Sequence, residues 1–341
     1  MLKGVPDGIY FLIVSAHGML REERKMGIEI VGTGLYVPPD VVSNDDLKEL
    51  VDTSDEWITQ RIGVKERRVS KTQSAADMAA EAAKNAIADA GVTAADIDMI
   101  IATTITSDTI CPTLGGSVEK AIGASCPAFD VNAACSGFVF AFDIAEKYLA
   151  SGAAKRILIV SGERMSKIID WSDRSICVIF GDGAGAAVVE SGDVYSSILY
   201  TTGDDSVIRI PNFDMENPFH NANGGLPYVF MDGQETFKFA VNKIVSDIKQ
   251  VAQNAGIEVS DIKHIVPHQA NARIIQYAAK RLGLPIERFY MNLQHYGNTS
   301  SASVPMALAE FAKSGAPKKG DIVALTAFGG GLSSGTCVFK W

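Results

Sequence analysis

Short apolar runs alternate along the chain with longer segments in which apolar residues recur at helical spacing. The runs Met99–Thr104 and Arg156–Ser161 predict buried strands, and the alanine-rich segment Ala75–Ala90 predicts a helix that Gly91 ends. Further elements are expected as strands at Ile28–Gly34 and, after the glycine-rich turn Val178–Gly185, at Ala186–Glu190, and as helices after Ser43, after Ser54 and over Pro112–Ile122. Strands that alternate with helices predict an α/β fold with mainly parallel sheets.

One stretch near the middle of the chain combines a buried strand, a tight turn and a helix. Alternation and β-branching predict a strand over Ala128–Asn132, and apolar residues at helical spacing predict a helix from Gly137 to about Leu149. Cys135 would lie where this helix begins, and unsatisfied N–H groups there favour negative charge. We therefore expect Cys135 to be biased toward the thiolate and its amide to help bind an oxyanion. The alternative is a small buried cysteine without chemistry.

The second half of the chain repeats the pattern of the first. Residues 85–100 (NAIADAGVTAADIDMI) align with residues 250–265 (QVAQNAGIEVSDIKHI), each with a helix, a glycine, a short turn and a strand. Three more correspondences follow in the same order: Phe129–Asn132 with Phe289–Asn292, Ser151–Ala153 with Ser314–Ala316, and Phe180–Gly185 with Phe328–Gly331. The long period indicates one duplicated βα half-domain, with expected limits of 26–195 and 196–341. Equivalent turns of the two halves should meet around a pseudo-twofold axis.

Two polar residues of the second half are placed to assist Cys135. His268 follows a strand that ends at Pro267 and is expected to begin a helix, and Asn298 lies in a small, polar segment that aligns with the Cys135 turn. A thiolate, a histidine and an asparagine at such junctions would form a nucleophile with two polar assistants. Taken singly, His268 is more often a capping or core histidine, and an asparagine beside glycine usually marks a turn.

Composition restricts the class of protein. The 341 residues are 47% hydrophobic and 21% charged, which suits a large core and argues against disorder. The net charge of −9 argues against nucleic acid as a partner. Five scattered cysteines show neither a disulfide framework nor metal-ligand spacing, so we expect a cytoplasmic protein without a bound metal. No apolar run is long enough to span a membrane, and residues 1–25 are expected to be a non-native or poorly ordered leader.

Two glycine-rich segments invite a nucleotide-binding interpretation that their context does not support. Gly329–Gly331 lacks the Lys-Ser/Thr of a phosphate-binding loop, which leaves a plain loop or a close backbone approach to a ligand. Gly181–Gly185 looks like a dinucleotide fingerprint, but a strand rather than a helix is expected after it. A Rossmann site is therefore rejected.

From Met26 to Trp341 the chain resembles β-ketoacyl-[acyl-carrier-protein] synthase III, a family of thiolase-fold condensing enzymes. The matching motifs are, in chain order, Asp55–Ile58 with Arg61, Asn132–Gly137, Asp170–Arg174, Phe180–Gly185, His268–Asn271, Gly297–Ser300 and Phe328–Gly331. The resemblance implies a thiolase-like fold whose duplicated halves form five αβαβα layers, a homodimer, and a Cys135–His268–Asn298 triad. Elongating relatives use a second histidine where Asn298 stands, and degradative thiolases carry a cysteine that Phe328–Gly331 lacks.

The resemblance also implies a reaction. Cys135 would accept the acyl group of acetyl-CoA or of a longer or branched acyl-CoA, with the oxyanion on the backbone N–H groups of Cys135 and Gly330. Malonyl-acyl carrier protein would then lose CO2, His268 and Asn298 would donate hydrogen bonds to the enolate, and the carbanion would attack the acyl group. The product is 3-oxoacyl-acyl carrier protein, the first intermediate of fatty acid synthesis. No metal or redox cofactor is expected.

Binding residues are implied in the same way. Trp57, Arg61 and Arg174 would flank the nucleotide of CoA, Asn271 would contact pantetheine, and Phe328 belongs to the same substrate-binding set. A basic patch for the acidic carrier protein would comprise Lys238, Arg273, Lys280 and Arg281. Many relatives carry a bulky aromatic residue before Pro112 that closes the acyl pocket across the dimer. Cys111 at this position would admit longer or branched primers.

Three rival functions stay open at the level of sequence. The first is a starter-unit condensing enzyme or acyltransferase of a specialised polyketide pathway. The second is a non-catalytic homologue that binds carrier protein, against which the complete triad argues. The third is a cysteine hydrolase that uses the same three residues and releases a free acid.

Overall fold

The computed structural model describes residues 27–211, 216–221 and 228–341, so the expected leader at 1–25 lies outside the described residues. The first half contains β1 (Ile28–Tyr36), β2 (Val41–Ser43), α2 (Asn44–Leu47), α3 (Asp55–Arg61), β3 (Glu66–Arg68), α4 (Ala75–Asp89), β4 (Met99–Thr103), α5 (Leu114–Ile122), β5 (Ala128–Val131), α6 (Gly137–Ser151), β6 (Arg156–Arg164), α7 (Arg174–Cys177) and β7 (Asp182–Ser191). The second contains β8 (Tyr195–Asp204), β9 (Ile208–Arg209), β10 (Phe230–Met231), α8 (Gly233–Ala255), β11 (Ile262–Pro267), α9 (Ala272–Leu282), α10 (Leu293–Tyr296), α11 (Ser303–Lys313), β12 (Ile322–Gly329) and β13 (Gly331–Lys340).

The two main sheets repeat one topology. The five-stranded sheet has the order β1–β7–β6–β4–β5, and the four-stranded sheet has the matching order β8–β13–β12–β11. Strand directions match as well, since β4–β6 and β11–β12 are parallel while the pairs that involve β7 and β13 are antiparallel. A parallel bridge from Ile265 to Phe289 stands where β5 pairs with β4. The duplication in the sequence therefore reappears as a duplicated sheet; the domain limit at 195/196 stays a prediction.

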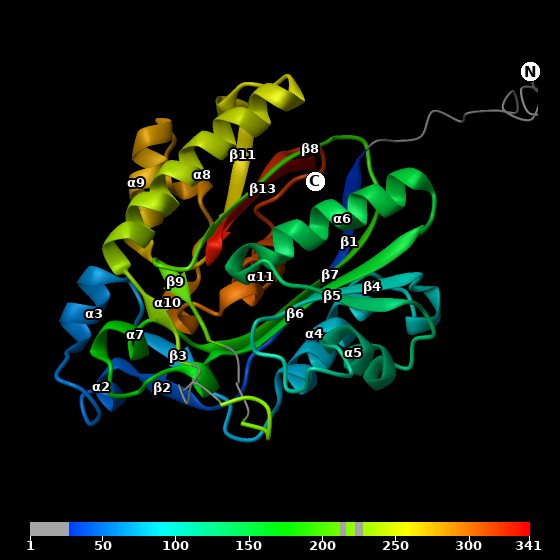
Figure 1. Ribbon diagram of the computed structural model, residues 1–341. Coiled ribbons are helices and arrows are strands. Elements are labelled where there is room, and N and C mark those ends of the chain that lie inside the picture. The colour runs from blue at the N-terminus through cyan, green and yellow to red at the C-terminus, as the bar shows by residue number, and fades with distance from the viewer. Residues whose placement is uncertain (1–26, 212–215, 222–227) are drawn as a thin grey trace, which may run out of the picture.

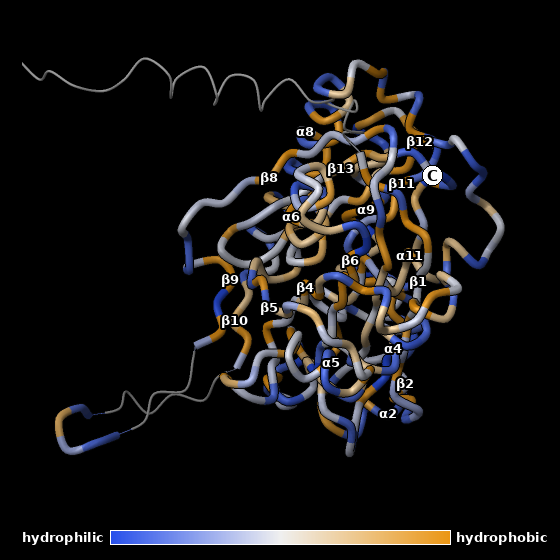
Figure 2. The backbone as a smooth tube through the Cα atoms, turned by 90° about the vertical axis from the view of Figure 1, so that its right-hand side faces the viewer, coloured by the Kyte–Doolittle hydropathy of each residue, from blue (hydrophilic) through white to orange (hydrophobic). Residues whose placement is uncertain are grey.

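Helices and sheets form five layers, and three apolar clusters fill the spaces between them. Helices α4 and α5 cover the outer face of the first sheet, α6 and α11 lie between the two sheets, and α8 and α9 cover the outer face of the second sheet (Figure 1). Successive residues of β6 face opposite sides of the sheet: Leu158 belongs to the outer apolar cluster and Ile159 to the central one. Figure 2 shows hydrophobic stretches gathered in the middle of the molecule. The layer order is αβαβα, that of the expected thiolase-like fold.

Two local predictions were wrong. The second half of the segment expected as a turn, Asp182–Gly185, instead begins β7, because Gly183 and Gly185 let α11 pack directly on the strand. A Cβ atom on Gly185 would lie 2.6 Å from the backbone nitrogen of Met306. His268 does not begin a helix either: α9 begins at Ala272, and the side chain of Asn271 caps it.

Candidate active site

Two short turns, one from each half, meet below a cavity. The 3-10 turn Ala134–Ser136 precedes α6, and the 3-10 turn Ser300–Ala302 precedes α11. Each turn contains a non-glycine residue at positive φ, Ala134 at 48° and Ser300 at 49°, a strained conformation that is concentrated at functional sites. The two turns contact each other, and the thiol of Cys135 donates to Ser300 Oγ at 3.5 Å. The internal alignment predicted this meeting of equivalent turns.

The cavity above the turns has a volume of about 610 Å³ and is built from both halves of the chain. Its walls include Cys135, His268 and Asn298, so the structure brings the three predicted catalytic residues to one space. Apolar groups form much of the remainder: Ile105, Phe140, Met165, Phe180, Ile208, Val229, Met231 and Phe328. Cys135 as a residue is partly exposed and belongs to the wall of the cavity. The arrangement suits a nucleophile at the base of an apolar pocket.

The imidazole of His268 is buried, and its hydrogen bonds define its state. Burial lowers the pKa of His268 to about 3, so the ring is neutral at physiological pH. Ser303 Oγ accepts from the N–H of Gln269 at 3.3 Å and lies 2.6 Å from His268 Nδ1. The serine proton can then point at Nδ1, which places the imidazole proton on Nε2. The edge-on ring of Phe328, with centroids 5.2 Å apart, fixes the plane of the imidazole.

The carboxamide of Asn298 is oriented by its own turn. The N–H of Ser300 donates to Asn298 Oδ1 at 2.8 Å, which leaves the amide nitrogen available as a donor. The backbone of Asn298 is pinned on both sides, since its N–H donates to the carbonyl of Ile179 at 2.9 Å and its carbonyl accepts from Gly181 at 3.1 Å. Asn298 and His268 can thus both present N–H groups in the cavity.

The expected thiolate bias of Cys135 was wrong for the resting protein. Burial raises the pKa of the Cys135 thiol to about 12, and the carboxylate of Glu163 acts in the same direction, whereas the hydrogen bond to Ser300 and the backbone amide oppose the rise. The turn before α6 supplies favourable amide groups, but the apolar cavity removes more solvation than these groups return. The resting nucleophile is a thiol.

The glycine-rich loop between β12 and β13 lies against the nucleophile. A Cβ atom on Gly329 would come within 2.7 Å of the backbone nitrogen of Cys135, so only glycine permits this approach. Gly330 lines the cavity beside it. A second link joins the same two segments, because the hydroxyl groups of Ser136 and Ser333 lie 2.7 Å apart. The backbone of the loop thus lies close to the backbone of Cys135. The oxyanion role of Gly330 stays a prediction.

The residues expected to hold CoA form a cluster outside the cavity walls. The guanidinium carbons of Arg174 and Arg61 lie 5.0 and 5.9 Å from the ring centroid of Trp57, on exposed side chains. Asn271 donates from Nδ2 to the carbonyl of Arg61 at 3.2 Å, and its neighbour Ala270 lines the cavity. The two arginines are exposed and Trp57 is half-buried, so the cluster is a cationic surface with an aromatic base. Phe328 is the one member of the expected set that lines the cavity.

The expected basic patch lies on the outer helices α8 and α9. All four of its side chains are exposed. Lys238 pairs with Glu235 at 2.7 Å, Arg281 donates to Asn242 at 2.6 Å, and Arg273 stands 6.0 Å from the ring of Phe237. Cys111 is exposed and does not line the cavity of its own chain. The roles of these residues stay predictions.

Sequence reasoning missed the hydroxyl groups that support the site. Ser300 accepts from the nucleophile, Ser303 bonds the imidazole, and Ser136 and Ser333 join the two loops. The only signal was the run Ser300–Ser303 of small polar residues at a helix start, which a single sequence does not separate from ordinary capping. Over the described residues, no group of three or more His, Cys, Asp or Glu side chains is arranged to hold a metal ion. Within the same ranges no helix is long and apolar enough to cross a membrane.

Comparison with known proteins agrees with this geometry. Residues 129–205 match the family model of 3-oxoacyl-[acyl-carrier-protein] synthase III, and residues 252–341 match the model of its C-terminal part. The chain is 45% identical to the β-ketoacyl-[acyl-carrier-protein] synthase III of Clostridium acetobutylicum over 320 residues, which cover 92% of this chain and 98% of that protein. The relative from Aquifex aeolicus is 42% identical over 321 residues, 93% of this chain and all of that protein.

Solved structures extend the comparison to the fold. The crystal structure of 3-oxoacyl-[acyl-carrier-protein] synthase III from Aquifex aeolicus superposes with a TM-score of 0.86 at 40% identity, covering 92% of this chain and 100% of that one. The priming β-ketosynthase of the R1128 polyketide pathway reaches a TM-score of 0.87 at 34% identity, covering 94% and 98%. Fold and site together define a thiolase-fold condensing enzyme, an acyltransferase. Within that class, the chain belongs to the β-ketoacyl-[acyl-carrier-protein] synthase III family.

Proposed function

We propose that this protein condenses an acyl-CoA primer with malonyl-acyl carrier protein to give 3-oxoacyl-acyl carrier protein, CoA and CO2, the step that initiates fatty acid synthesis. The observation that carries the proposal is the convergence of Cys135, His268 and Asn298 on one apolar cavity. A nucleophile with two neutral hydrogen-bond donors suits the formation of a thioester and then of an enolate.

In the first half-reaction the primer moves from CoA to Cys135. The sulfur of Cys135 attacks the thioester carbonyl and loses its proton, the bond to the CoA sulfur breaks, and CoA leaves as a thiol. The thiol starts in a hydrogen bond to Ser300 Oγ, so the sulfur is oriented before the primer arrives. The negative oxygen of the tetrahedral intermediate would bind the N–H groups of Cys135 and Gly330. The contact of Gly329 with the Cys135 nitrogen supports this assignment because it brings the two segments together.

In the second half-reaction the malonyl group loses CO2, and its electron pair moves into an enolate. His268 Nε2–H and the amide N–H of Asn298 would donate to the enolate oxygen. The nucleophilic carbon then attacks the acyl carbonyl on Cys135, whose sulfur leaves and takes up a proton. The contacts of Ser303 with His268 Nδ1 and of the Ser300 N–H with Asn298 Oδ1 support this assignment, because they would leave both donors free for the enolate. A buried neutral imidazole suits this role, since it donates without adding a charge to the cavity.

The substrates would approach over the exposed cationic surfaces. Trp57 with Arg61 and Arg174 offers a stacking face and two positive charges to the nucleotide and phosphates of CoA. Asn271 is bonded to the carbonyl of Arg61 and follows Ala270, which lines the cavity, so it would contact pantetheine. On α8 and α9 the side chains of the basic patch, Lys238, Arg273, Lys280 and Arg281, would attract the acidic carrier protein and accelerate encounter.

The enzyme would act as a homodimer in the cytoplasm. Strand β5 is the edge of the five-stranded sheet and is half-buried, and Ile110, in the loop between β4 and α5, is 93% exposed. An open edge strand and an exposed large apolar side chain are features that a second copy of the chain would cover. That dimer would bring Cys111 to the partner's acyl pocket. All five cysteines are free, which suits a reducing compartment, and the chemistry calls for no metal or redox cofactor.

Mass spectrometry of the intact protein tests the first half-reaction. Wild-type protein incubated with acetyl-CoA should gain one acetyl group, and Cys135→Ala should gain none. Addition of malonyl-acyl carrier protein should discharge the adduct and release CO2 with a 3-oxoacyl product. Discharge to free acid would instead support a hydrolase, and failure to acylate Cys135 would refute the proposal.

A second candidate is a starter-unit enzyme of a polyketide pathway, because the R1128 priming β-ketosynthase is 34% identical to this chain. The higher identities of the synthase III relatives, 45% and 42%, favour the initiation of fatty acid synthesis over this alternative. A panel of acyl-CoAs tests the acyl pocket, which either function would use to select its primer. A strict preference for acetyl-CoA would argue against a widened acyl pocket, whereas efficient use of longer or branched primers would support it.

A further inference from the structure

A fully buried carboxylate next to the catalytic turn has no role in the reaction described above. Glu163 lies on β6 with no exposed surface. Burial raises the pKa of the Glu163 carboxyl, and hydrogen bonds from Ser301, Thr106, Thr104 and the backbone of Ile105 act against the rise. A buried carboxylate is costly unless its oxygens are fully bonded, so these partners explain how the protein retains it.

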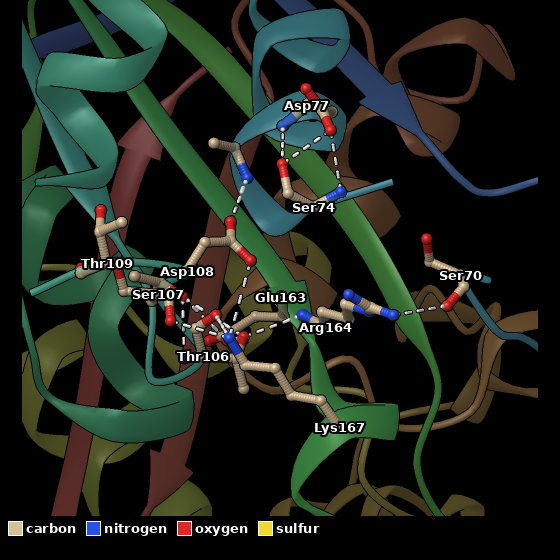
Figure 3. Close-up of polar contacts among 12 residues, drawn as sticks. Ser70, Ser74, Asp77, Thr106, Ser107, Asp108, Thr109, Glu163, Arg164 and Lys167 are labelled. Atoms are coloured by element: carbon tan, nitrogen blue, oxygen red, sulfur yellow. Dashed lines mark hydrogen bonds and ion pairs between the residues drawn. The ribbon is translucent and has the colours of Figure 1, made fainter. Parts of the chain in front are cut away.

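One side of the carboxylate holds the segment that borders the primer cavity. Thr104 and Thr106 donate from their hydroxyl groups to Oε2 at 3.1 and 2.5 Å, and the N–H of Ile105 reaches both oxygens at 3.2 Å. The side chain of Ile105 lines the cavity. Figure 3 shows Lys167 reaching the same segment, where its ammonium donates to the carbonyl oxygens of Thr106 and Ser107 at 2.6 and 2.8 Å. The cavity segment is therefore fastened to β6 and to the turn that follows it.

The other side of the carboxylate holds the catalytic turn. Ser301 Oγ donates to Oε1 at 2.5 Å and lies 2.6 Å from Ser161 Oγ. The preceding residue, Ser300, accepts a hydrogen bond from the thiol of Cys135, and its N–H orients the carboxamide of Asn298. One carboxylate thus connects a residue that lines the pocket to the turn that holds the sulfur and an enolate donor.

We propose that Glu163 is a positioning residue that fixes the primer pocket and the catalytic turn in a single frame, so that the bound acyl group meets the sulfur at a defined depth. This inference rests on the proposed function. It predicts that loss of the connection changes both the rate of the reaction and the choice of primer. A purely structural carboxylate would change the stability of the fold and leave the choice of primer unaltered.

A second hydrogen-bonded carboxylate provides the matched control. Asp143 on α6 has a side chain that is 15% exposed, and it accepts from the hydroxyl groups of Tyr195 and Ser197 on β8 at 3.0 and 2.5 Å. It therefore fastens two elements in the same way, but neither Asp143 nor its two partners line the cavity. Asp143→Asn should lower the melting temperature and leave the choice of primer as it is in the wild type.

Glu163→Gln keeps the shape and most of the bonds of the side chain. The amide oxygen can retain the hydroxyl donors Thr104 and Thr106, because Thr106 already accepts from the N–H of Arg164 at 2.8 Å. The amide NH2 must then face Ser301, whose proton has to turn away toward Ser161 or the carbonyl of Thr103. The substitution therefore inverts the bond to the catalytic turn and spares the fastening of the cavity segment.

The experiment measures acyl transfer to Cys135 by intact mass, and kcat and KM for condensation, with acetyl-CoA and with a straight-chain eight-carbon acyl-CoA. Glu163→Gln should lower kcat about 10- to 100-fold, since a small displacement of reacting groups costs that much. Two single-bond variants divide the effect: Ser301→Ala should lower kcat at constant primer ratio, and Thr106→Val should change the ratio of kcat/KM between the two primers.

The outcomes separate the two proposals. Wild-type protein that forms no acyl adduct would refute the proposed function itself. If the wild-type protein acylates normally, and Glu163→Gln, Ser301→Ala and Thr106→Val all match the kcat and primer ratio of Asp143→Asn, the positioning role alone is overturned. If Glu163→Gln does not fold, the two single-bond variants decide the question in its place.

Discussion

The hydrogen bond between Ser303 and His268 gives the sharpest prediction about catalysis. Ser303→Ala removes the partner of Nδ1, which lies 2.6 Å away and is buried. The imidazole is then free to carry its proton on Nδ1, and Nε2 would offer a lone pair instead of a donor to the enolate. We expect condensation to slow while acyl transfer to Cys135 stays near the wild-type rate, because acyl transfer needs no donor from His268.

The magnitude follows from the cost of an unsatisfied buried group. Leaving one such polar atom without its partner costs about 1–3 kcal/mol. At 1.4 kcal/mol per factor of ten, the rate of condensation should fall about 5- to 150-fold. The N–H of Gln269 also loses its acceptor at 3.3 Å, so a modest drop in the free energy of unfolding should accompany the change.

The assay compares two rates in four proteins. Acyl transfer is followed by intact mass after rapid quenching, and condensation by release of CO2 from malonyl-acyl carrier protein, in wild type, Ser303→Ala, His268→Ala and the double variant. If Ser303 acts through the imidazole, its substitution should cost nothing further once His268 is gone. Ser314→Ala, at the exposed end of α11, is the control. Equal losses in both half-reactions, or additive losses in the double variant, would refute the assigned role.

Four further predictions concern the glycine loop, the nucleophile, the imidazole and the acyl pocket. Gly329→Ala would place a Cβ atom 2.7 Å from the backbone nitrogen of Cys135. Acyl transfer, measured by intact mass, should fall at least 100-fold, and the free energy of unfolding, measured by urea titration, should fall by about 1–3 kcal/mol. A normal rate of acyl transfer would contradict the close contact of the two segments. The pKa of Cys135 is raised to about 12, so its reaction with iodoacetamide in Cys111→Ala protein should keep rising about tenfold per pH unit above pH 9, and a plateau near pH 7 would restore the thiolate interpretation. The pKa of His268 is lowered to about 3 from an ordinary 6.5, so its contribution to stability is present above pH 6.5 and declines as the pH falls toward 3, while kcat for condensation should show no inflection near pH 6.5; a bell-shaped profile centred there would indicate a charged imidazole. Cys111→Phe should restrict the enzyme to short primers without changing the rate with acetyl-CoA, and an unaltered primer profile would exclude Cys111 from the acyl pocket.

Much of the fold was predictable because it is encoded locally and then repeated. Residues 99–102 of β4 and 157–160 of β6 are apolar without alternation, because helices cover both faces of their sheet. The correspondence of Phe129–Asn132 with Phe289–Asn292 reappears as β5 in one half and as the bridge from Ile265 to Phe289 in the other. Local rules failed where tertiary packing decided the conformation. Gly183 and Gly185 were expected in a turn but lie in β7, where the absence of a side chain lets α11 pack against the strand.

The sequence by itself determined the α/β class, the duplication and the three residues that converge on the cavity. Each of these follows from the order and spacing of residues along the chain, which can be read without the structure. Only the tertiary structure decided the protonation states of the catalytic residues. The depth of the cavity keeps Cys135 a thiol and His268 neutral, and the hydroxyl groups of Ser300 and Ser303 orient their partners across turns that no periodicity connects. Desolvation depends on everything that surrounds a group in three dimensions, and a single sequence does not contain that distribution in readable form.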